Sequence, residues 1–294
     1  MLFRQRQDLT LGDILAFLYD INSTAFRSLG GWFTHGRFCN CQVNPTILGL
    51  EGMGKRVAIL QSNYLPWKGY FDLIGMVDEF ILYDDVQYTK NDWRNRNRIK
   101  TRNGLRWITI PVQYHYPQKI KDTLVSDPDW NRRHWKSISQ EYSRAKYFRD
   151  YKDAFEDLYL KGDEKYLSLI NYRFIAAVCD MLGIRTKLSW SMDYRLVEGK
   201  TERLVDLCRQ AGASEYLSGP SAKGYIEEAC FLSGGIALRY MDYSGYPEYR
   251  QLHGDFVHEV SIIDLIFNEG PGAASFLKSF GGARTAGTGE RGEA

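Results

Sequence analysis

The chain contains no long hydrophobic run. No uninterrupted apolar stretch reaches the roughly 18–20 residues that a membrane-spanning helix needs. The first twenty residues hold no secretory signal either, because Asp8 and Asp13 interrupt their apolar positions. The chain has only five cysteines, and this small, odd number argues against the disulfide framework of a secreted protein. These absences predict a cytoplasmic protein without a membrane span.

No cofactor signature stands out in the sequence. Cys39 and Cys41 lack the second cysteine pair or histidine cluster that would complete a zinc site. No glycine motif for a dinucleotide is present. Cys179 and Cys208 fall on apolar helical faces, which favours buried thiols over nucleophiles. We therefore predict no metal site, and the cofactor stays unknown.

Positive charge is concentrated in one segment. The whole chain carries a net charge of only +2. Between Val86 and Trp107, however, seven basic residues stand against one acid, Asp92, so that this segment alone has a charge of 7 − 1 = +6. Such a concentration within a nearly neutral chain predicts an anionic ligand.

The two ends differ from the middle of the chain. Residues 1–52 have one amphipathic helical stretch and then no clear period, and a buried-strand pattern begins abruptly after Met53. We interpret 1–52 as an N-terminal extension that reflects a mis-assigned start, with a small genuine subdomain as the alternative. Residues 282–294 are glycine-rich and lack large apolar side chains, which predicts disorder. One domain over 53–281 remains.

Strand and helix patterns alternate within this domain. Apolar strand patterns occur at 57–61, 79–84, 185–190, 215–218 and 236–242, with helical patterns between them. The segment from about 90 to 183 interrupts the alternation with a β-hairpin, which turns at Asn103-Gly104, and with helices. The sequence therefore predicts a Rossmann-like α/β fold, with a mainly parallel sheet of about five strands and an insertion between the second and third.

The strand pattern also predicts where a ligand binds. In open parallel sheets, ligands lie outside the carboxyl ends of the strands. The segments that follow the expected strands are rich in amides, hydroxyls, carboxylates and aromatic rings. From them we predict a substrate-binding set: Gln61, Asn63, Tyr64, Trp67, Lys68, Tyr70, Asp85, Gln87, Tyr88, Ser218 and Ser221.

The most specific segment is Asn63-Tyr64-Leu65-Pro66-Trp67-Lys68-Gly69-Tyr70. Together with Asp84–Tyr88, Asn95-Arg96, Tyr246–Gln251 and Ser261–Gly270, it resembles the sequence pattern of WbqC-like proteins over nearly all of 55–280. That family is associated with gene clusters for O-antigen, lipopolysaccharide and related surface polysaccharides. The resemblance implies a role in such biosynthesis and brings no agreed catalytic mechanism.

A weaker, architectural resemblance is to the nucleotidylyltransferase and pantoate–amine ligase superfamily. Those proteins carry a His-x-Gly-His signature where this chain has Trp67-Lys68-Gly69-Tyr70. Histidines at those places would stabilise phosphate charge in the transition state. Both are absent, which argues against ATP cleavage. Lys68, at the start of a predicted helix, could still hold an anion together with backbone N–H groups.

The basic segment has two interpretations. If it is extended, its period of two places Arg94, Arg96, Arg98, Lys100 and Arg102 on one face. Arg94, Arg96 and Arg98 would then bind the phosphates of a nucleotide-sugar or of a phosphopantetheine arm. The alternative is an exposed hairpin whose arginines pair with neighbouring acids. Trp93 and Trp107 flank the stripe and suit nucleic acid, but the absence of any RNA- or DNA-binding module argues against it.

Our first functional hypothesis is an amide-forming transferase. It would move an acyl or aminoacyl group, from an acyl-carrier donor for example, onto the amine of an amino sugar or similar acceptor. Asp84 or His253 would deprotonate this amine, since an ammonium group cannot attack. The alternative hypothesis is a non-catalytic protein that binds a nucleotide-sugar or carrier within a biosynthetic assembly, and the third is a nucleic-acid-binding protein.

Overall fold

The computed structural model describes residues 54–281. The predicted extension at 1–52 and the predicted tail at 282–294 therefore lie outside the described residues, as do Cys39 and Cys41.

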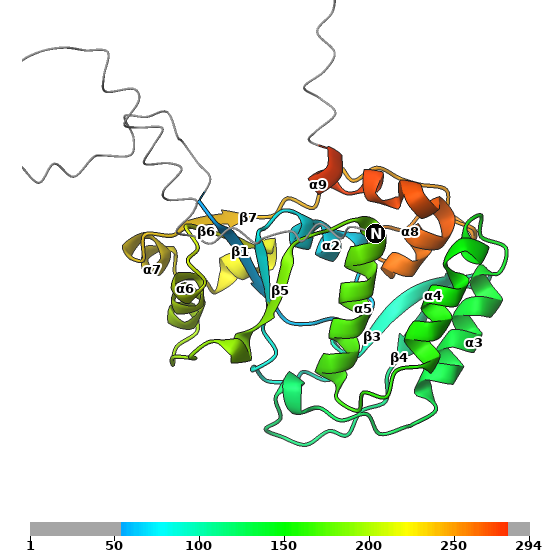
Figure 1. Cartoon of the computed structure of the whole chain (residues 1–294), viewed down its shortest axis with the longest axis horizontal. Helices are drawn as coiled ribbons and strands as arrows, with labels where there is room; N and C mark the ends of the chain where they lie inside the picture. Colours follow the sequence, from blue (N-terminus) through cyan, green and yellow to red (C-terminus); the bar gives the residue numbers. More distant parts are fainter. Residues whose placement is uncertain (1–53, 282–294) are drawn as a thin grey trace, which may run out of the picture. The chain divides into compact units, whose positions relative to one another are not determined.

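The described region is built on one parallel sheet (Figure 1). Its strands are β1 (Arg56–Leu60), β2 (Glu79–Leu82), β5 (Lys187–Trp190), β6 (Glu215–Ser218) and β7 (Ala237–Tyr240). They lie in the order β5-β2-β1-β6-β7, and every neighbouring pair is parallel. This arrangement confirms the α/β fold that strand–helix alternation predicted.

Side chains alternate between the two faces of the sheet, as the strand period requires. Val57 and Ile59 pack on one face, against α6 (Thr201–Gln210) and α7 (Glu228–Ser233). Ala58 packs on the opposite face, in a larger core that includes α2 (Lys68–Gly75) and α5 (Leu167–Leu182). Both faces are therefore covered, which explains why these strands appear in the sequence as continuous apolar runs.

The predicted insertion lies between β2 and β5. It contains the antiparallel hairpin of β3 (Arg96–Thr101) and β4 (Gly104–Thr109), followed by α3 (Trp130–Tyr142), α4 (Phe148–Leu160) and α5. In Figure 1 the insertion packs beside α8 (Ile262–Glu269), which is followed by α9 (Lys278–Gly281). Short 3₁₀ helices complete the chain: η3 (Ile120–Asp122), η4 (Ser191–Asp193), η5 (Pro220–Gly224) and η6 (Gly270–Phe276).

None of the helices between residues 54 and 281 is long and apolar enough to cross a membrane. The longest of them, α5, has 16 residues.

The strand order places a switch point between β1 and β6. From β1 the chain proceeds outward through β2 to β5, and it then returns to the other side of β1 for β6 and β7. The connections after β1 and β6 therefore leave toward opposite faces, which is the arrangement at which open α/β sheets bind their ligands. The residues that follow these two strands, from 61 and from 219, are consequently the first candidates for a site.

Candidate functional site

The loop after β1, residues 61–67, is held by hydrogen bonds from several other segments. They run from Ser62 N to Asp84 Oδ1 (2.8 Å), from Tyr64 N to Trp93 O (3.0 Å), from Asn97 Nδ2 to Tyr64 O (3.2 Å) and Leu65 O (2.7 Å), and from Ile262 N to Pro66 O (3.0 Å). Within the loop, Leu65 has a φ of 43°, which a leucine rarely adopts. Such strain persists where the surroundings hold it, so the loop is pre-organised.

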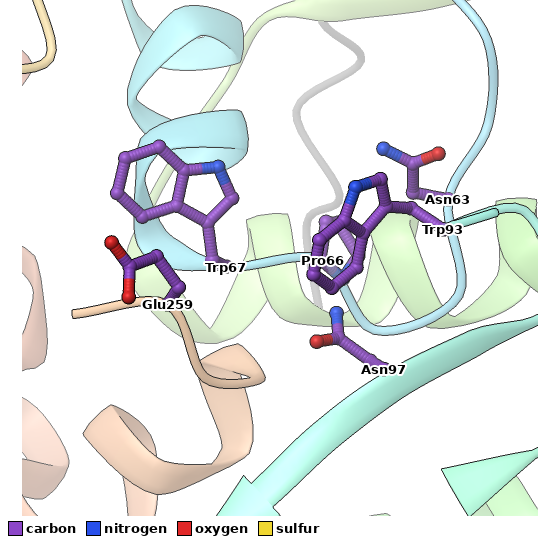
Figure 2. Close-up of a pocket in the computed structure, with 6 residues that line it drawn as sticks. All are labelled: Asn63, Pro66, Trp67, Trp93, Asn97 and Glu259. Atoms are coloured by element: carbon purple, nitrogen blue, oxygen red, sulfur yellow. The ribbon is translucent and has the colours of Figure 1, made fainter. Parts of the chain in front are cut away.

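A cavity of about 170 Å³ lies beside this loop (Figure 2). The loop, the start of the hairpin and the C-terminal segment all contribute to its lining, which consists of Asn63, Pro66, Trp67, Trp93, Asn97 and Glu259. Figure 2 shows the rings of Trp67 and Trp93 on either side of the opening, with the Glu259 carboxylate beside Trp67. Asn63 and Trp67 were predicted for the site, and the structure brings both to this cavity.

Backbone pairing brings Glu259 to the cavity from a distant part of the chain. Ser261 N donates to the carbonyl of Arg98 at 2.8 Å, and the next residue, Ile262, binds the loop. The Glu259 side chain is 66% exposed, and its closest cation is Arg98, with Nη2 at 3.8 Å from Oε2. From residues 54–281 its carboxylate accepts no hydrogen bond. Both oxygens are thus available to a ligand.

Arg94 lies over the switch point of the sheet. Its Nη1 donates to Asn63 Oδ1, and its Nη2 is 3.5 Å from Asp92 Oδ2. Burial raises the pKa of Tyr225, after β6, and the positive charge of Arg94 opposes this rise. The guanidinium, on a side chain that is 14% exposed, therefore acts on groups from both sides of the switch point.

Arg96 and Arg98 flank a pair of tryptophans. The rings of Trp93 and Trp107 are 5.2 Å apart, and they are 39% and 44% exposed. The Arg96 guanidinium lies 4.3 Å from the Trp107 ring centre, and that of Arg98 lies 5.7 Å from the same ring. Because Trp93 also lines the cavity, this cationic and aromatic surface begins at the cavity wall.

The predicted five-residue basic stripe is wrong beyond Arg98. Lys100 is 4% exposed, and its Nζ donates to Gln251 Oε1 at 2.5 Å. Arg102 lies at the hairpin turn, 4.0 Å from Glu141 of α3. The C-terminal segment covers the strand face at Lys100, so the period of two does not continue as an exposed surface.

Asp84 was predicted as a base at the edge of the sheet. Its carboxylate does lie beside the loop, where it accepts from Ser62 N and from the hydroxyl of Ser168, but the residue has no exposed surface. Burial raises the pKa of Asp84, and the hydrogen bonds from Ser168 and Ser62 oppose this rise. The Asp84 carboxylate is therefore enclosed, and its hydrogen bond with Ser62 N holds the loop in place.

His253, the other predicted base, lies against α3. Its Nε2–H donates to the carbonyl of Glu141 at 3.0 Å, and the Glu141 carboxylate is 3.9 Å away. Within residues 54–281 no hydrogen bond or ion pair joins His253 to a residue that lines the cavity.

The three predicted tyrosines point into the core. The Tyr64 hydroxyl donates to His134 Nδ1 at 2.9 Å and lies 2.6 Å from the Tyr159 hydroxyl. Tyr70 donates to the carbonyl of Gln61 at 3.0 Å, and Tyr88 is 2% exposed. The hydroxyl groups of Tyr64 and Tyr70 support the helical insertion and the loop, and the aromatic rings that line the cavity are those of tryptophan.

Lys68 occupies an aromatic cage. Its Nζ donates to the carbonyl of Pro247 at 2.8 Å and lies 5.2 Å from the ring centres of Tyr246 and Tyr249 and 5.5 Å from that of Phe256. The residue is 3% exposed, and burial lowers the pKa of Lys68 to about 8. Lys68 therefore fixes the C-terminal segment that leads to Glu259.

The remaining predicted residues are spread around the edge of the sheet. Asp85 pairs with Lys119 at 3.0 Å and with Lys121 at 3.4 Å. Gln87 is exposed and donates to its neighbour Tyr88. After β6, Ser218 is buried and Ser221 is exposed on η5. None of these residues lines the cavity.

Comparison with known proteins assigns the family. The sequence pattern of the WbqC-like protein family matches residues 61–276. The chain belongs to this family. Over 226 residues it is 53% identical to a Mycobacterium tuberculosis protein described only as uncharacterized, which covers 76% of this chain and 98% of that relative. No solved structure matches the chain.

The WbqC-like region contains the whole site. It begins at Gln61, the first residue of the loop, and ends beyond Glu259, so that every residue lining the cavity falls within it, as does Arg94. Sequence reasoning missed the roles of Asn97 and Glu259. Trp93 was noted only as a residue beside the basic stripe. Its position next to Arg94 in the sequence is the one local signal that indicated a place in the site.

Proposed function

We propose that this WbqC-like protein transfers an acyl or aminoacyl group onto the amine of an amino sugar or a similar acceptor. The observation that carries the proposal is the double role of Asn63, which lines the cavity and accepts a hydrogen bond from Arg94. An anion at Arg94 and a small ring in the cavity would therefore be neighbours. Membership of the family, which indicates a protein of a biosynthetic cluster, supports a substrate of this kind.

Arg94 would bind the phosphate of a nucleotide-sugar or of a carrier-linked donor. A guanidinium binds phosphate oxygens in pairs, and partial burial strengthens such contacts. Among residues 54–281, Arg94 forms an ion pair only with Asp92, at 3.5 Å. This distance leaves much of the positive charge of the guanidinium uncompensated. The place of Arg94 at the switch point is also where α/β sheets bind their ligands.

The chemistry requires a proton acceptor beside the amine. An acceptor bound as an ammonium group first gives one proton to a carboxylate. The neutral amine then attacks the acyl carbonyl, a C–N bond forms, the bond to the leaving group breaks, and the leaving group takes the second proton from the nitrogen. Glu259 is the carboxylate that lines the cavity, and in this proposal it receives the first proton. In this proposal Asp84 acts indirectly, because its carboxylate accepts from Ser62 N and holds the loop in place.

Direct transfer fits the cysteines of the described region better than a protein thioester does. Burial raises the pKa of Cys179 and of Cys208 to about 12, so that neither is a thiolate at neutral pH. Burial raises the pKa of Cys230 as well. An activated thioester, on an acyl carrier for example, is the donor that this proposal assumes.

The full chain, incubated with nucleotide-linked amino sugars and with acyl or aminoacyl thioesters, should form an amide that mass spectrometry detects. Arg94→Gln should lower kcat/KM by about tenfold or more, the size of one shielded charge-assisted contact. Arg102→Gln is the matched control, because Arg102 lies at the hairpin turn, and it should leave the rate unchanged. Equal rates for the two variants would contradict the role of Arg94.

A second candidate is a non-catalytic protein that binds a nucleotide-sugar or a carrier. The burial of Asp84 and the contact of His253 with α3 favour it, because neither predicted base reaches the cavity. A nucleotide-sugar that raises the melting temperature, in the absence of any amide product across the donors, would establish this candidate over the transferase.

A further inference from the structure

We infer that the Trp67–Trp93 cavity holds a single sugar ring that carries a protonated amino group, and that Glu259 selects this group. The inference rests on the proposed function, since it names the acceptor class of that same site. Three properties of the cavity lead to it: its size, its aromatic walls and its two free polar groups.

The size of the cavity restricts the ligand to one small ring. Its volume of about 170 Å³ is below the 300–1,000 Å³ or so that is typical of pockets for drug-sized molecules. A whole nucleotide-sugar would therefore place only its sugar inside. The remainder would extend over the opening, toward Arg94 and the exposed Trp93–Trp107 surface.

Two indole rings suit the faces of a sugar. Each face of a pyranose presents C–H groups, which pack on a flat apolar surface, while its hydroxyl groups point outward from the rim. Trp67 and Trp93 lie on either side of the opening (Figure 2), and the Trp67 ring is fixed edge-on against Tyr243 at 5.2 Å. A fixed aromatic wall offers a large contact area with little loss of conformational entropy.

Apart from the indole N–H groups of the two tryptophans, the polar side chains of the cavity offer one free donor and one free acceptor. Asn97 is fully used, because its Nδ2 binds two loop carbonyls and its Oδ1 accepts from Arg98 N. Asn63 differs: its Oδ1 accepts from Arg94, whereas its Nδ2 donates to no atom of residues 54–281. Glu259 provides the acceptor, and Figure 2 shows it at the opposite side of the cavity from Asn63.

This arrangement discriminates by charge. An ammonium group on the ring can donate to Glu259, and Asn63 can donate to a ring hydroxyl on the other side. A neutral sugar offers the Glu259 carboxylate only a hydroxyl donor and no opposite charge, and an N-acetylated sugar loses the positive charge and adds bulk. Arg98, at 3.8 Å, is close enough to orient the carboxylate without a hydrogen bond that would occupy it.

The test measures binding of free monosaccharides to the full chain by saturation-transfer NMR at pH 6, where the amine of glucosamine is protonated. Glucosamine should bind about tenfold more tightly than glucose, the size of one charge-assisted hydrogen bond, and N-acetylglucosamine no better than glucose. Glu259→Gln should abolish this preference, because a neutral amide does not favour an ammonium group over a hydroxyl. Glu248→Gln removes a nearby carboxylate that does not line the cavity, and it should preserve the preference.

A second pair of variants tests the walls. Trp93→Leu should weaken all three sugars, while Trp107→Leu, which changes the exposed partner outside the cavity, should not. Circular dichroism on each variant checks that the fold is intact. Equal binding of glucose and glucosamine, a preference that survives Glu259→Gln, or no binding of any sugar near its solubility limit would each overturn the inference.

These outcomes are separate from those of the transferase assay. Amide formation without a charge preference would retain the proposed function and overturn the inference. A preference that depends on Glu259, without any amide product, would retain the inference and leave the protein as a binding protein for amino sugars.

Discussion

The hydroxyl of Ser168, at the start of α5, donates to the buried carboxylate of Asp84 just beyond the end of β2. The other carboxylate oxygen of Asp84 accepts from Ser62 N, at the beginning of the cavity loop. One side chain thus joins two strand ends to a helix of the insertion. Because the first turn of a helix has free N–H groups and a positive dipole, a carboxylate there is favourably placed.

Asp84→Ala should lower the free energy of unfolding by about 2–4 kcal/mol, since it leaves a buried N–H and a buried hydroxyl without a partner. Asp84→Asn should lower it less, because the amide oxygen can still accept from Ser62 N. Chemical denaturation measures both. Asp122→Asn, at an exposed carboxylate 4.0 Å from Lys121, is the control and should change stability by less than about 1 kcal/mol. An Asp84→Ala protein of unchanged stability that had lost activity would instead indicate direct catalysis.

Among the three arginines, Arg94 should dominate the binding of anions. Arg94→Ala should weaken a nucleoside diphosphate by about tenfold or more in calorimetric titration, since a partly buried guanidinium is lost. Arg96→Ala should have a smaller effect, because that side chain stacks on Trp107 at the surface. A larger effect of Arg96 than of Arg94 would shift the anion site from the switch point to the hairpin.

Lys68 should make stability rise with pH in the alkaline range. Burial lowers the pKa of Lys68 from 10.5 to about 8, so between these values the unfolded chain keeps a proton that the folded chain has released. Stability then increases with pH, by at most about 1.4 kcal/mol per unit. Lys68→Met should lack this contribution. The difference in unfolding free energy between the two proteins, measured from pH 7 to 10, should therefore change with pH, and a constant difference would show that Lys68 has an ordinary pKa.

His134 should make stability rise with pH in the acidic range, as Lys68 does in the alkaline range. Burial lowers the pKa of His134 from 6.5 to about 4, and its Nδ1 accepts from Tyr64 while Nε2–H donates to the carbonyl of Thr109. Between these pH values the unfolded chain binds a proton that the folded chain does not, so stability falls as pH falls from 6.5 toward 4. His134→Gln should reduce this loss, whereas His115→Gln, at an exposed position, should leave it unchanged. Parallel acid denaturation curves for wild type and His134→Gln would contradict the assignment.

The strands could be predicted because the sequence signal of their burial lies within each strand's own residues. A strand covered on both faces is apolar at nearly every position, as Val57-Ala58-Ile59-Leu60 is, and such a run is recognisable without knowledge of its neighbours. Lys100 marks the limit of this reasoning. Alternation along β3 assigns it a face, but whether that face is exposed depends on Gln251, which is distant in the chain.

The candidate site was predictable where it follows a strand directly. Asn63 and Trp67 come just after β1, so the rule for parallel sheets located them. The same rule failed for the direction of Tyr64, because its hydroxyl meets His134 and Tyr159, which belong to helices much later in the chain. It could not find Glu259, which reaches the cavity through the pairing of Ser261 with Arg98 and has no strand before it.

The long sequence separation between the cavity walls bears on how the protein is made. A ribosome releases the loop of Asn63 and Trp67 well before it releases Glu259, which follows the last strand of the sheet. The nascent chain can assemble its hairpin and first strands while this cavity still lacks its carboxylate. The aromatic cage around Lys68 is likewise completed only after the sheet, since its rings belong to residues 246–256. The lining of the cavity is therefore completed only after the sheet, and a chain released prematurely after β7 would contain all five strands of the sheet but lack Glu259.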